Sequence, residues 1–126
     1  MAGSKRILFV EDDRFISDMY SRVLTKAGYQ LDFAYTGTEG LSKAQSGSYD
    51  LILLDIMMPE MTGIEILKAL RGEDGSGMPD SRIIILTNLA QDVASQDALK
   101  AKADGYLIKA DIVPSKLLKV IEGMGL

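Results

Sequence analysis

The sequence contains no cysteine and no histidine, and each absence excludes a class of chemistry. Without cysteine there can be no disulfide bond, no thiolate nucleophile and no Cys-ligated zinc. Without histidine the chain lacks the commonest general base, the commonest metal ligand and every Ser-His or Cys-His mechanism. Any chemistry must therefore use carboxylates, hydroxyls, lysines and a hard metal ion.

Long apolar runs are also missing, and so is an excess of positive charge. The longest apolar run is far shorter than a membrane span, and the N-terminus has no secretory hydrophobic region. We therefore expect a cytoplasmic protein without membrane insertion. Lys and Arg number 14 against 18 Asp and Glu, the formal net charge is -4, and the basic residues are scattered. This charge distribution does not attract nucleic acid, so we expect no direct DNA or RNA binding.

The length and composition are those of one globular domain. A chain of 126 residues fits a single core, and 47% hydrophobic and 25% charged residues are close to the averages for globular proteins. The Gly-rich segment 72–80 is too short to link two domains. We predict one domain over residues 1–126, of which residues 1–4 are expected to be disordered or not native.

Short apolar runs alternate along the chain with segments of helical spacing. Residues 51–54 (Leu-Ile-Leu-Leu) are the clearest central strand, because they are apolar on both faces as a parallel sheet requires. Between residues 14 and 27 apolar side chains recur at three- and four-residue spacing, and Gly28 is a suitable helix stop. The predicted strands are 7–10, 31–35, 51–54, 83–86 and 106–108, and the predicted helices are 14–27, 38–46, 63–71, 90–102 and 114–123.

Five strands that alternate with five helices predict an α/β fold, with a parallel sheet covered on both faces. At this size we favour the doubly wound, flavodoxin-like strand order 2-1-3-4-5, which has a topological switch point between the first and third strands. Ligands in such sheets bind beyond the carboxyl ends of the strands, beside the switch point.

Polar residues follow the predicted strands at this edge of the sheet. The first strand ends in residues 11–13 (Glu-Asp-Asp), the third in Asp55, the fourth in Thr87 and the fifth in Lys109. Clustered carboxylates repel one another unless a cation is present, and oxygen ligands with room for water favour Mg²⁺ over Ca²⁺. A carboxylate nucleophile, a metal, a lysine and a hydroxyl together predict phosphoryl transfer onto Asp55.

These residues resemble the receiver domain of two-component response regulators, a CheY-like domain. Each motif alone is weak, whereas all of them in order and at near-standard spacing are highly specific. The resemblance covers residues 5–124 and rests on the runs at 7–13 and 55–59 (Asp-Ile-Met-Met-Pro), on Gly63, and on Thr87, Tyr106 and Lys109.

The resemblance implies that Asp55 accepts a phosphoryl group from a phosphohistidine on a sensor histidine kinase or a His-phosphotransfer protein. Asp12 would bind Mg²⁺ directly and Glu11 through water, while Asp55 and the backbone carbonyl of Met57 would be further ligands. Lys109 would pair first with Asp55 and then with the phosphoryl oxygens. Such a domain is not an enzyme beyond its own phosphorylation and slow dephosphorylation.

The resemblance also implies a switch. Thr87 would move to bind the phosphoryl group, and Tyr106 would then turn inward and alter the face made by the fourth helix, fifth strand and fifth helix. This face would bind a downstream protein of unknown identity, with the chain a monomer or a phosphorylation-dependent dimer. Asp13 falls one place past the acidic pair, where it would start the first helix.

Three positions depart from the family pattern. Ala110 follows Lys109 where Lys-Pro with a cis peptide is common, so this loop is expected to be strained or differently arranged. Pro114 lies one residue further from the lysine than is usual, which indicates a remodelled loop. Asn88 stands where small residues are frequent, and its bulk is expected to affect transfer and hydrolysis rates.

Two other functions remain open. One is a metal-dependent phosphohydrolase with an aspartyl nucleophile, although its usual second acid would fall at Met57; the other is a receiver-like binding module that does not use phosphate.

Individual residues also have simpler structural interpretations. Residues 11–13 could be a solvated helix start, and Thr87 could be a helix cap. Lys109 could be an ordinary surface lysine, and Tyr106 could be an aromatic residue of the core. The side chains of Met57 and Met58 could lie in the core or face a partner.

Overall fold

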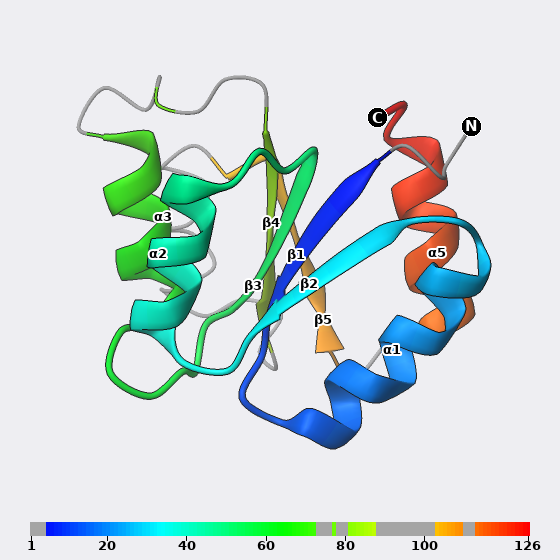
Figure 1. Ribbon diagram of the computed structural model, residues 1–126, viewed down its shortest axis with the longest axis horizontal. Coiled ribbons are helices and arrows are strands. Elements are labelled where there is room, and N and C mark those ends of the chain that lie inside the picture. The colour runs from blue at the N-terminus through cyan, green and yellow to red at the C-terminus, as the bar shows by residue number, and fades with distance from the viewer. Residues whose placement is uncertain (1–4, 73–76, 78–80, 88–102, 110–112) are drawn as a thin grey trace.

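A computed structural model describes residues 5–72, 77, 81–87, 103–109 and 113–126 (Figure 1). The predicted helix 90–102, the predicted disorder of residues 1–4, Asn88 and the residue that follows Lys109 all lie outside these ranges. Every other predicted helix and strand is present, with ends that shift by at most one residue. The elements are β1 (Arg6–Val10), α1 (Arg14–Lys26), β2 (Gln30–Ala34), α2 (Gly37–Ser46), β3 (Leu51–Asp55), α3 (Gly63–Arg71), β4 (Arg82–Thr87), β5 (Gly105–Ile108) and α5 (Pro114–Gly123).

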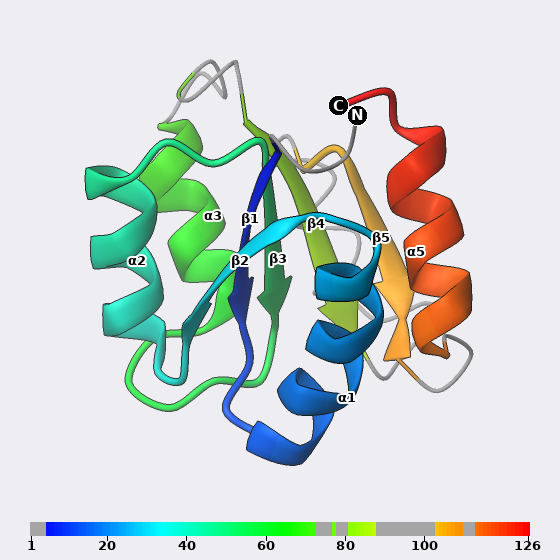
Figure 2. The same cartoon turned by 45° about the vertical axis from the view of Figure 1, so that its right-hand side comes forward.

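The five strands form one sheet in the order β2-β1-β3-β4-β5, and every neighbouring pair is parallel. The predicted strand order and the switch point between β1 and β3 are therefore confirmed. Helices α2 and α3 cover one face of the sheet, and α1 and α5 cover the other (Figures 1 and 2). In the described part of the chain, no helix is long and apolar enough to cross a bilayer.

The core has two halves, one on each face of the sheet. In β1, Ile7 and Phe9 belong to the cluster under α1 and α5, whereas Leu8 and Val10 belong to the cluster under α2 and α3. This two-residue alternation is a general property of strands. The same alternation determines the face of the sheet toward which each polar side chain at a strand end points.

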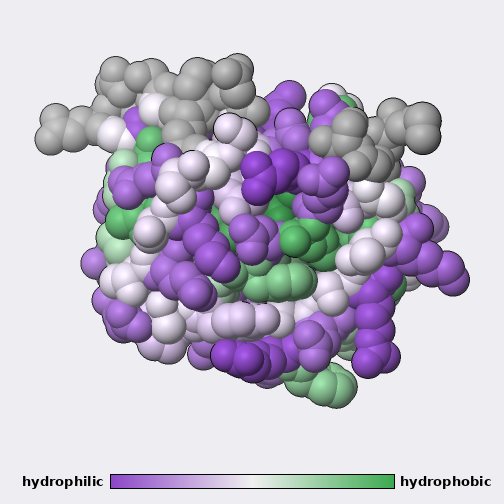
Figure 3. All heavy atoms as spheres, viewed as in Figure 1, coloured by the Kyte–Doolittle hydropathy of each residue, from purple (hydrophilic) through white to green (hydrophobic). Residues whose placement is uncertain are grey.

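Strand β2 lies at one edge of the sheet and is less buried than β1 or β3. In Figure 3 hydrophobic atoms are visible in the middle of a mainly hydrophilic face, where β2 crosses the front of the molecule in Figure 1. A polar contact lies at this edge: the Tyr49 hydroxyl donates to Asp32 Oδ2 at 2.7 Å. The described edge strand is therefore mixed in character rather than a continuous apolar surface.

Helix caps account for several polar residues near the carboxyl edge of the sheet. The Asp13 carboxylate caps α1, because its Oδ1 accepts the backbone N–H groups of Phe15 at 3.0 Å and Ile16 at 3.2 Å. Thr62 and Glu65 form a reciprocal capping box at the start of α3. The predicted role of Asp13 at the start of the first helix is therefore confirmed, and the predicted helix 63–71 begins after the Thr62 cap.

Candidate functional site at the carboxyl edge of the sheet

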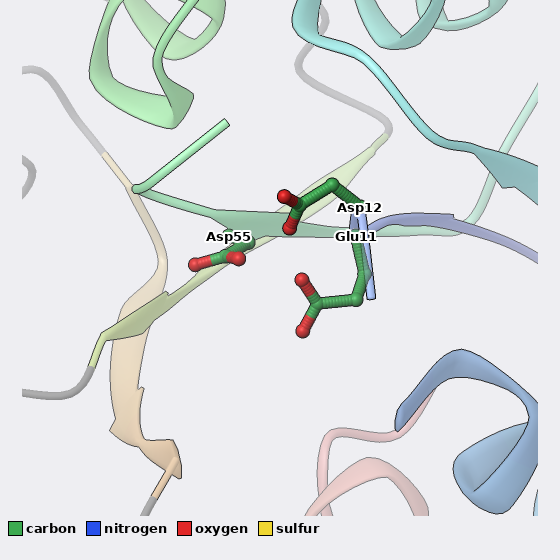
Figure 4. A group of neighbouring side chains, drawn as sticks. All are labelled: Glu11, Asp12 and Asp55. Carbon is green, nitrogen blue, oxygen red and sulfur yellow. The ribbon is translucent and has the colours of Figure 1, made fainter. Parts of the chain in front are cut away.

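Three carboxylates meet beside the switch point. Glu11 and Asp12 follow β1, and Asp55 ends β3; one carboxylate oxygen from each lies within 4.8 Å of the others. Figure 4 shows the three side chains turned toward a common space between the ends of these strands. The sequence predicted this meeting from the strand order, and the fold brings the residues together as expected.

The three acids differ in their exposure to water. The exposed fraction of Glu11 is 0% and that of Asp55 is 4%, whereas Asp12 is exposed. Glu11 lies two residues after Phe9 and Asp55 two residues after Leu53, so both continue the face that packs under α1 and α5. Asp12 follows Val10 in the same way and continues the opposite face. The buried pair and the exposed acid therefore approach one space from different faces of the sheet.

Lys109 joins the two buried acids. Its Nζ lies 2.5 Å from Glu11 Oε1 and 3.2 Å from Asp55 Oδ2. The sequence predicted a partnership with Asp55 but not the shorter contact with Glu11. The signal for that contact was the residue type itself, because glutamate is one methylene longer than aspartate and so reaches farther across the sheet.

The electrostatics of the cluster follow from burial and crowding. Burial first, and the neighbouring Asp55 second, raise the pKa of Glu11 to about 7 against the opposing effect of Lys109. Burial also raises the pKa of Asp12, and so does its contact with Glu11. For Lys109, burial lowers the pKa, but the contacts with Glu11 and Asp55 outweigh burial and leave it raised. The carboxylates therefore carry more negative charge than Lys109 alone compensates.

The donor set fits a hard divalent cation. All the acidic ligands offer oxygen, and Glu11 Oε2 is buried without a hydrogen-bond partner among the residues that the structure describes. A buried carboxylate oxygen without a partner is costly unless a ligand or ion satisfies it. Few carboxylates together with an exposed side are typical of Mg²⁺ sites, where water completes the coordination.

The loop after β3 lies next to the Asp55 carboxylate. The Met57 N–H donates to Asp55 Oδ1 at 3.3 Å, so the backbone of Met57 is close to that carboxylate. A role of the Met57 carbonyl as a metal ligand stays a prediction. The side chains of the two methionines diverge: Met57 is 73% exposed, whereas Met58 is 8% exposed and belongs to the core.

The same loop is tied to the start of α2. The Gly37 N–H donates to the Pro59 carbonyl at 3.0 Å, and the Thr38 hydroxyl donates to Glu60 Oε1 at 2.5 Å. Glu60 has a φ of 71°, in the left-handed region that non-glycine residues seldom occupy. These contacts were not predicted, because nothing in the sequence pairs Thr38 with Glu60 across the fold.

Thr87 and Tyr106 lie on neighbouring strands, on the same face of the sheet. Thr87 ends β4 and is buried, two residues after the core residue Ile85. Tyr106 pairs with Ile85 in the register of β4 and β5, and it is partly buried against the cluster under α2 and α3. The reading of Tyr106 as a half-buried aromatic agrees with this position, and a switching movement of either residue stays a prediction.

The fold and this site define an α/β domain that carries a cluster of carboxylates and a lysine at its topological switch point. The family model of the response regulator receiver domain matches residues 7–122. The chain belongs to this family, and it is a signalling domain of the two-component type.

Curated relatives agree with this assignment. The chain is 39% identical over 104 residues to the transcriptional regulatory protein DltR of Streptococcus agalactiae, with 82% of this chain and 45% of DltR covered. It is 38% identical over 104 residues to the transcriptional regulatory protein CusR of Escherichia coli, with 82% and 44% covered. The chain therefore spans less than half the length of these relatives.

Solved structures are similar over nearly the whole chain. A CheY-like receiver domain protein from Methanospirillum hungatei has a TM-score of 0.83 and 35% identity, with 95% of this chain and 92% of that chain covered. The response regulator TrrA of Thermotoga maritima, solved in complex with Mg²⁺ and BeF, has a TM-score of 0.74 and 35% identity, with 94% and 97% covered.

Proposed function

We propose that this domain accepts a phosphoryl group on Asp55, in an Mg²⁺-dependent reaction, from a phosphohistidine of a sensor histidine kinase or a His-phosphotransfer protein. The observation that carries the proposal is the position of Asp55, which is buried at the switch point, 3.2 Å from Lys109 and grouped with Glu11 and Asp12. A buried carboxylate between an ammonium group and a metal site is suited to nucleophilic attack on phosphorus.

In the proposed reaction an Asp55 carboxylate oxygen attacks the phosphorus atom. A P–O bond forms, the P–N bond to the donor imidazole breaks, and the imidazole leaves with the electron pair of that bond. Lys109 stays beside the carboxylate and neutralises charge on the phosphoryl oxygens, since its Nζ already lies at hydrogen-bond distance from Asp55. Thr87, buried at the end of the neighbouring strand, would donate its hydroxyl to the phosphoryl group.

The residues that would hold Mg²⁺ are Asp12, Asp55, Glu11 and the carbonyl of Met57. When bound, the ion neutralises the crowded carboxylates and draws phosphoryl oxygens to the site. The unpartnered Glu11 Oε2 and the shared space of the three carboxylates support this ligand set. The complex of TrrA with Mg²⁺ and BeF supports it further, because TrrA is a relative of the same fold.

The output would be a change of surface. Movement of Thr87 toward the phosphoryl group would let Tyr106 turn inward, on the face of the sheet that both residues share. The affected surface would comprise β5, α5 and residues 90–102, and it would bind a downstream protein as a monomer or a phosphorylation-dependent dimer. Direct contact with nucleic acid is not part of this proposal.

The proposal is tested with Mg²⁺ and acetyl phosphate as a small phosphodonor, by intact-protein mass spectrometry at neutral pH. The wild-type chain should gain the mass of one phosphoryl group, and Asp55→Asn should gain none. Asp18→Asn is the matched control, because Asp18 is an exposed acid on α1 and should leave the gain unchanged.

Each contrary result contradicts the proposal in a different way. A phosphoryl gain that persists in Asp55→Asn would remove Asp55 as the acceptor. Steady turnover of p-nitrophenyl phosphate would indicate the phosphohydrolase alternative. Absence of both Mg²⁺ binding and phosphorylation would indicate a binding module that does not use phosphate.

A further inference from the structure

Strand β2 is an edge of the described sheet, so one side of its backbone faces no further strand of that sheet (Figure 1). The backbone groups of successive strand residues point alternately to the two sides of the strand. The Ala34 carbonyl accepts the Glu11 N–H at 3.0 Å, so it points toward β1. The backbone groups of Phe33 and of Tyr35, one residue before and one after Ala34, therefore point toward the open edge.

Three of these outward groups are bonded to charged side chains of the same chain. The Phe33 N–H donates to Asp32 Oδ1 at 3.0 Å, and the Phe33 carbonyl accepts from Lys43 Nζ on α2. The Tyr35 N–H donates to Glu39 Oε1 at 2.7 Å. We call Asp32, Glu39 and Lys43 the edge-capping residues. A strand that joined this edge would need the same backbone groups that these side chains occupy.

Two of the edge-capping residues also contact each other. Lys43 Nζ lies 3.4 Å from Asp32 Oδ1, and the hydroxyl of the buried Tyr49 donates to Asp32 Oδ2 at 2.7 Å. The hydrogen bond from Tyr49 holds the pKa of Asp32 below its usual range. The side chains of Lys43 and Asp32 are 36% and 43% exposed, so their ion pair adds little to stability. Occupation of the backbone at the edge is the more specific consequence of this arrangement.

We propose that the edge-capping residues prevent β2 from pairing with β2 of a second copy of this chain. Unpaired backbone groups at a sheet edge are a template for such pairing, and charged side chains at the edge oppose it. A two-fold axis would set the two β2 strands antiparallel, with the same outward groups used on both. The Phe33 and Tyr35 rings, which stack at a centroid distance of 6.4 Å, would supply apolar contact surface beside the paired backbones. The proposal does not depend on chemistry at Asp55.

The test compares two double variants of equal net charge. Glu39→Ala/Lys43→Ala removes two of the edge-capping side chains. The matched control, Lys68→Ala/Glu122→Ala, removes the same residue types from exposed positions on α3 and α5, away from β2. Asp32 stays in both variants, because its loss would leave the buried Tyr49 hydroxyl without this partner.

Two measurements are made on the unphosphorylated chain without a phosphodonor. The first is hydrogen exchange of the backbone amides by NMR, at low and at high protein concentration. The second is sedimentation over the same range of concentrations, which gives the dissociation constant of any dimer.

At low concentration the Tyr35 amide should exchange about five- to tenfold faster in Glu39→Ala/Lys43→Ala than in the control, the effect expected of one lost hydrogen bond. At high concentration the same variant should dimerise at least about tenfold more tightly than the control. In that dimer the Phe33 and Tyr35 amides should become protected, because they pair with the second copy.

Three results would overturn the proposal. In one, the Tyr35 amide exchanges faster but the variant associates no more than the control. In the second, the variant associates without added protection at Phe33 and Tyr35, so another surface is used. In the third, the wild type already dimerises with these amides protected. If circular dichroism shows that the double variant does not fold, Glu39→Ala alone is judged by the same measurements.

Discussion

The carboxyl group of Glu11 is buried away from solvent. It is fully buried, one of its oxygens contacts Lys109 at 2.5 Å, and the other has no partner among the described residues. Burial of a charged carboxylate is unfavourable unless it is paired and hydrogen-bonded, and here only half of the group is satisfied. Glu11 is therefore expected to destabilise the metal-free fold when ionised, and a cation should relieve that cost.

Stability without metal should depend on pH through Glu11. The pKa of this group is about 7 in the folded chain, against an ordinary value of 4.5. Between these values the folded chain retains a proton that the unfolded chain releases, so the free energy of unfolding falls as pH rises through the window. We expect a loss on the order of 1–3 kcal/mol, measured by urea denaturation in chelator.

Glu11→Gln is the control for this pH dependence. An amide does not titrate, so the variant should lack the part of the slope that Glu11 contributes. Lys109 does not confuse the comparison, because its pKa is raised and it stays protonated throughout the window. Identical slopes for the wild type and Glu11→Gln would contradict the assignment.

At the scale of the elements, helix α3 begins in direct contact with the end of β3 at Asp55. A Cβ atom on Gly63 would lie 2.4 Å from the Asp55 carbonyl oxygen, closer than real atoms approach. The Gly63 N–H also donates to the Ile56 carbonyl at 3.1 Å. Glycine is therefore required at this position of the motif by packing, and the start of α3 sets the position of the end of β3.

Gly63→Ala should push the start of α3 away from the backbone at the end of β3. Because the neighbouring atoms belong to the backbone, we expect a loss of about 1–3 kcal/mol in the free energy of unfolding and slower phosphorylation of Asp55. The matched control is Gly123→Ala at the end of α5, where a Cβ atom would meet nothing within 4 Å. Urea denaturation should show the control unchanged or slightly more stable, and equal losses in both variants would overturn the explanation.

At the scale of the whole molecule, folding brings the Asp55 carboxylate beside two acids that are adjacent in the sequence. Glu11, Asp12 and Asp55 share one space, and Lys109 is the described cation in contact with the two buried members of the group. Global stability should therefore depend on the Asp55 carboxylate and on added Mg²⁺.

Asp55→Ala should leave the metal-free fold as stable as the wild type or about 1 kcal/mol more stable, because repulsion falls and Glu11 keeps Lys109 as its partner. Mg²⁺ should stabilise the wild type by about 2.7 kcal/mol at a hundredfold excess over its Kd, and the variant less. Thermal unfolding in chelator and in Mg²⁺ measures both effects. A large drop in melting temperature for Asp55→Ala in chelator would contradict the repulsion argument.

Strand order, helix caps and the meeting of the acids follow from the sequence itself. Residues 7–10 and 51–54 are apolar on both faces, which in an α/β chain selects central parallel strands, and Thr62 with Glu65 determines the start of α3 through contacts three residues apart. Local signals of this kind do not depend on the rest of the fold. Once the order of the strands in the sheet is set, Glu11 and Asp55 must lie on either side of the switch point, at the ends of β1 and β3.

Only the tertiary structure decided which side chains touch. Lys109 reaches Glu11 across 98 positions of sequence and Asp55 across 54 positions, and Arg71 reaches Asp104 at 2.8 Å across 33 positions. Such contacts depend on side-chain length and on where each helix lies over the sheet, and no local pattern encodes either. The sequence by itself determined which charged residues follow the strands, and the tertiary packing decided that Lys109 contacts Glu11 as well as Asp55.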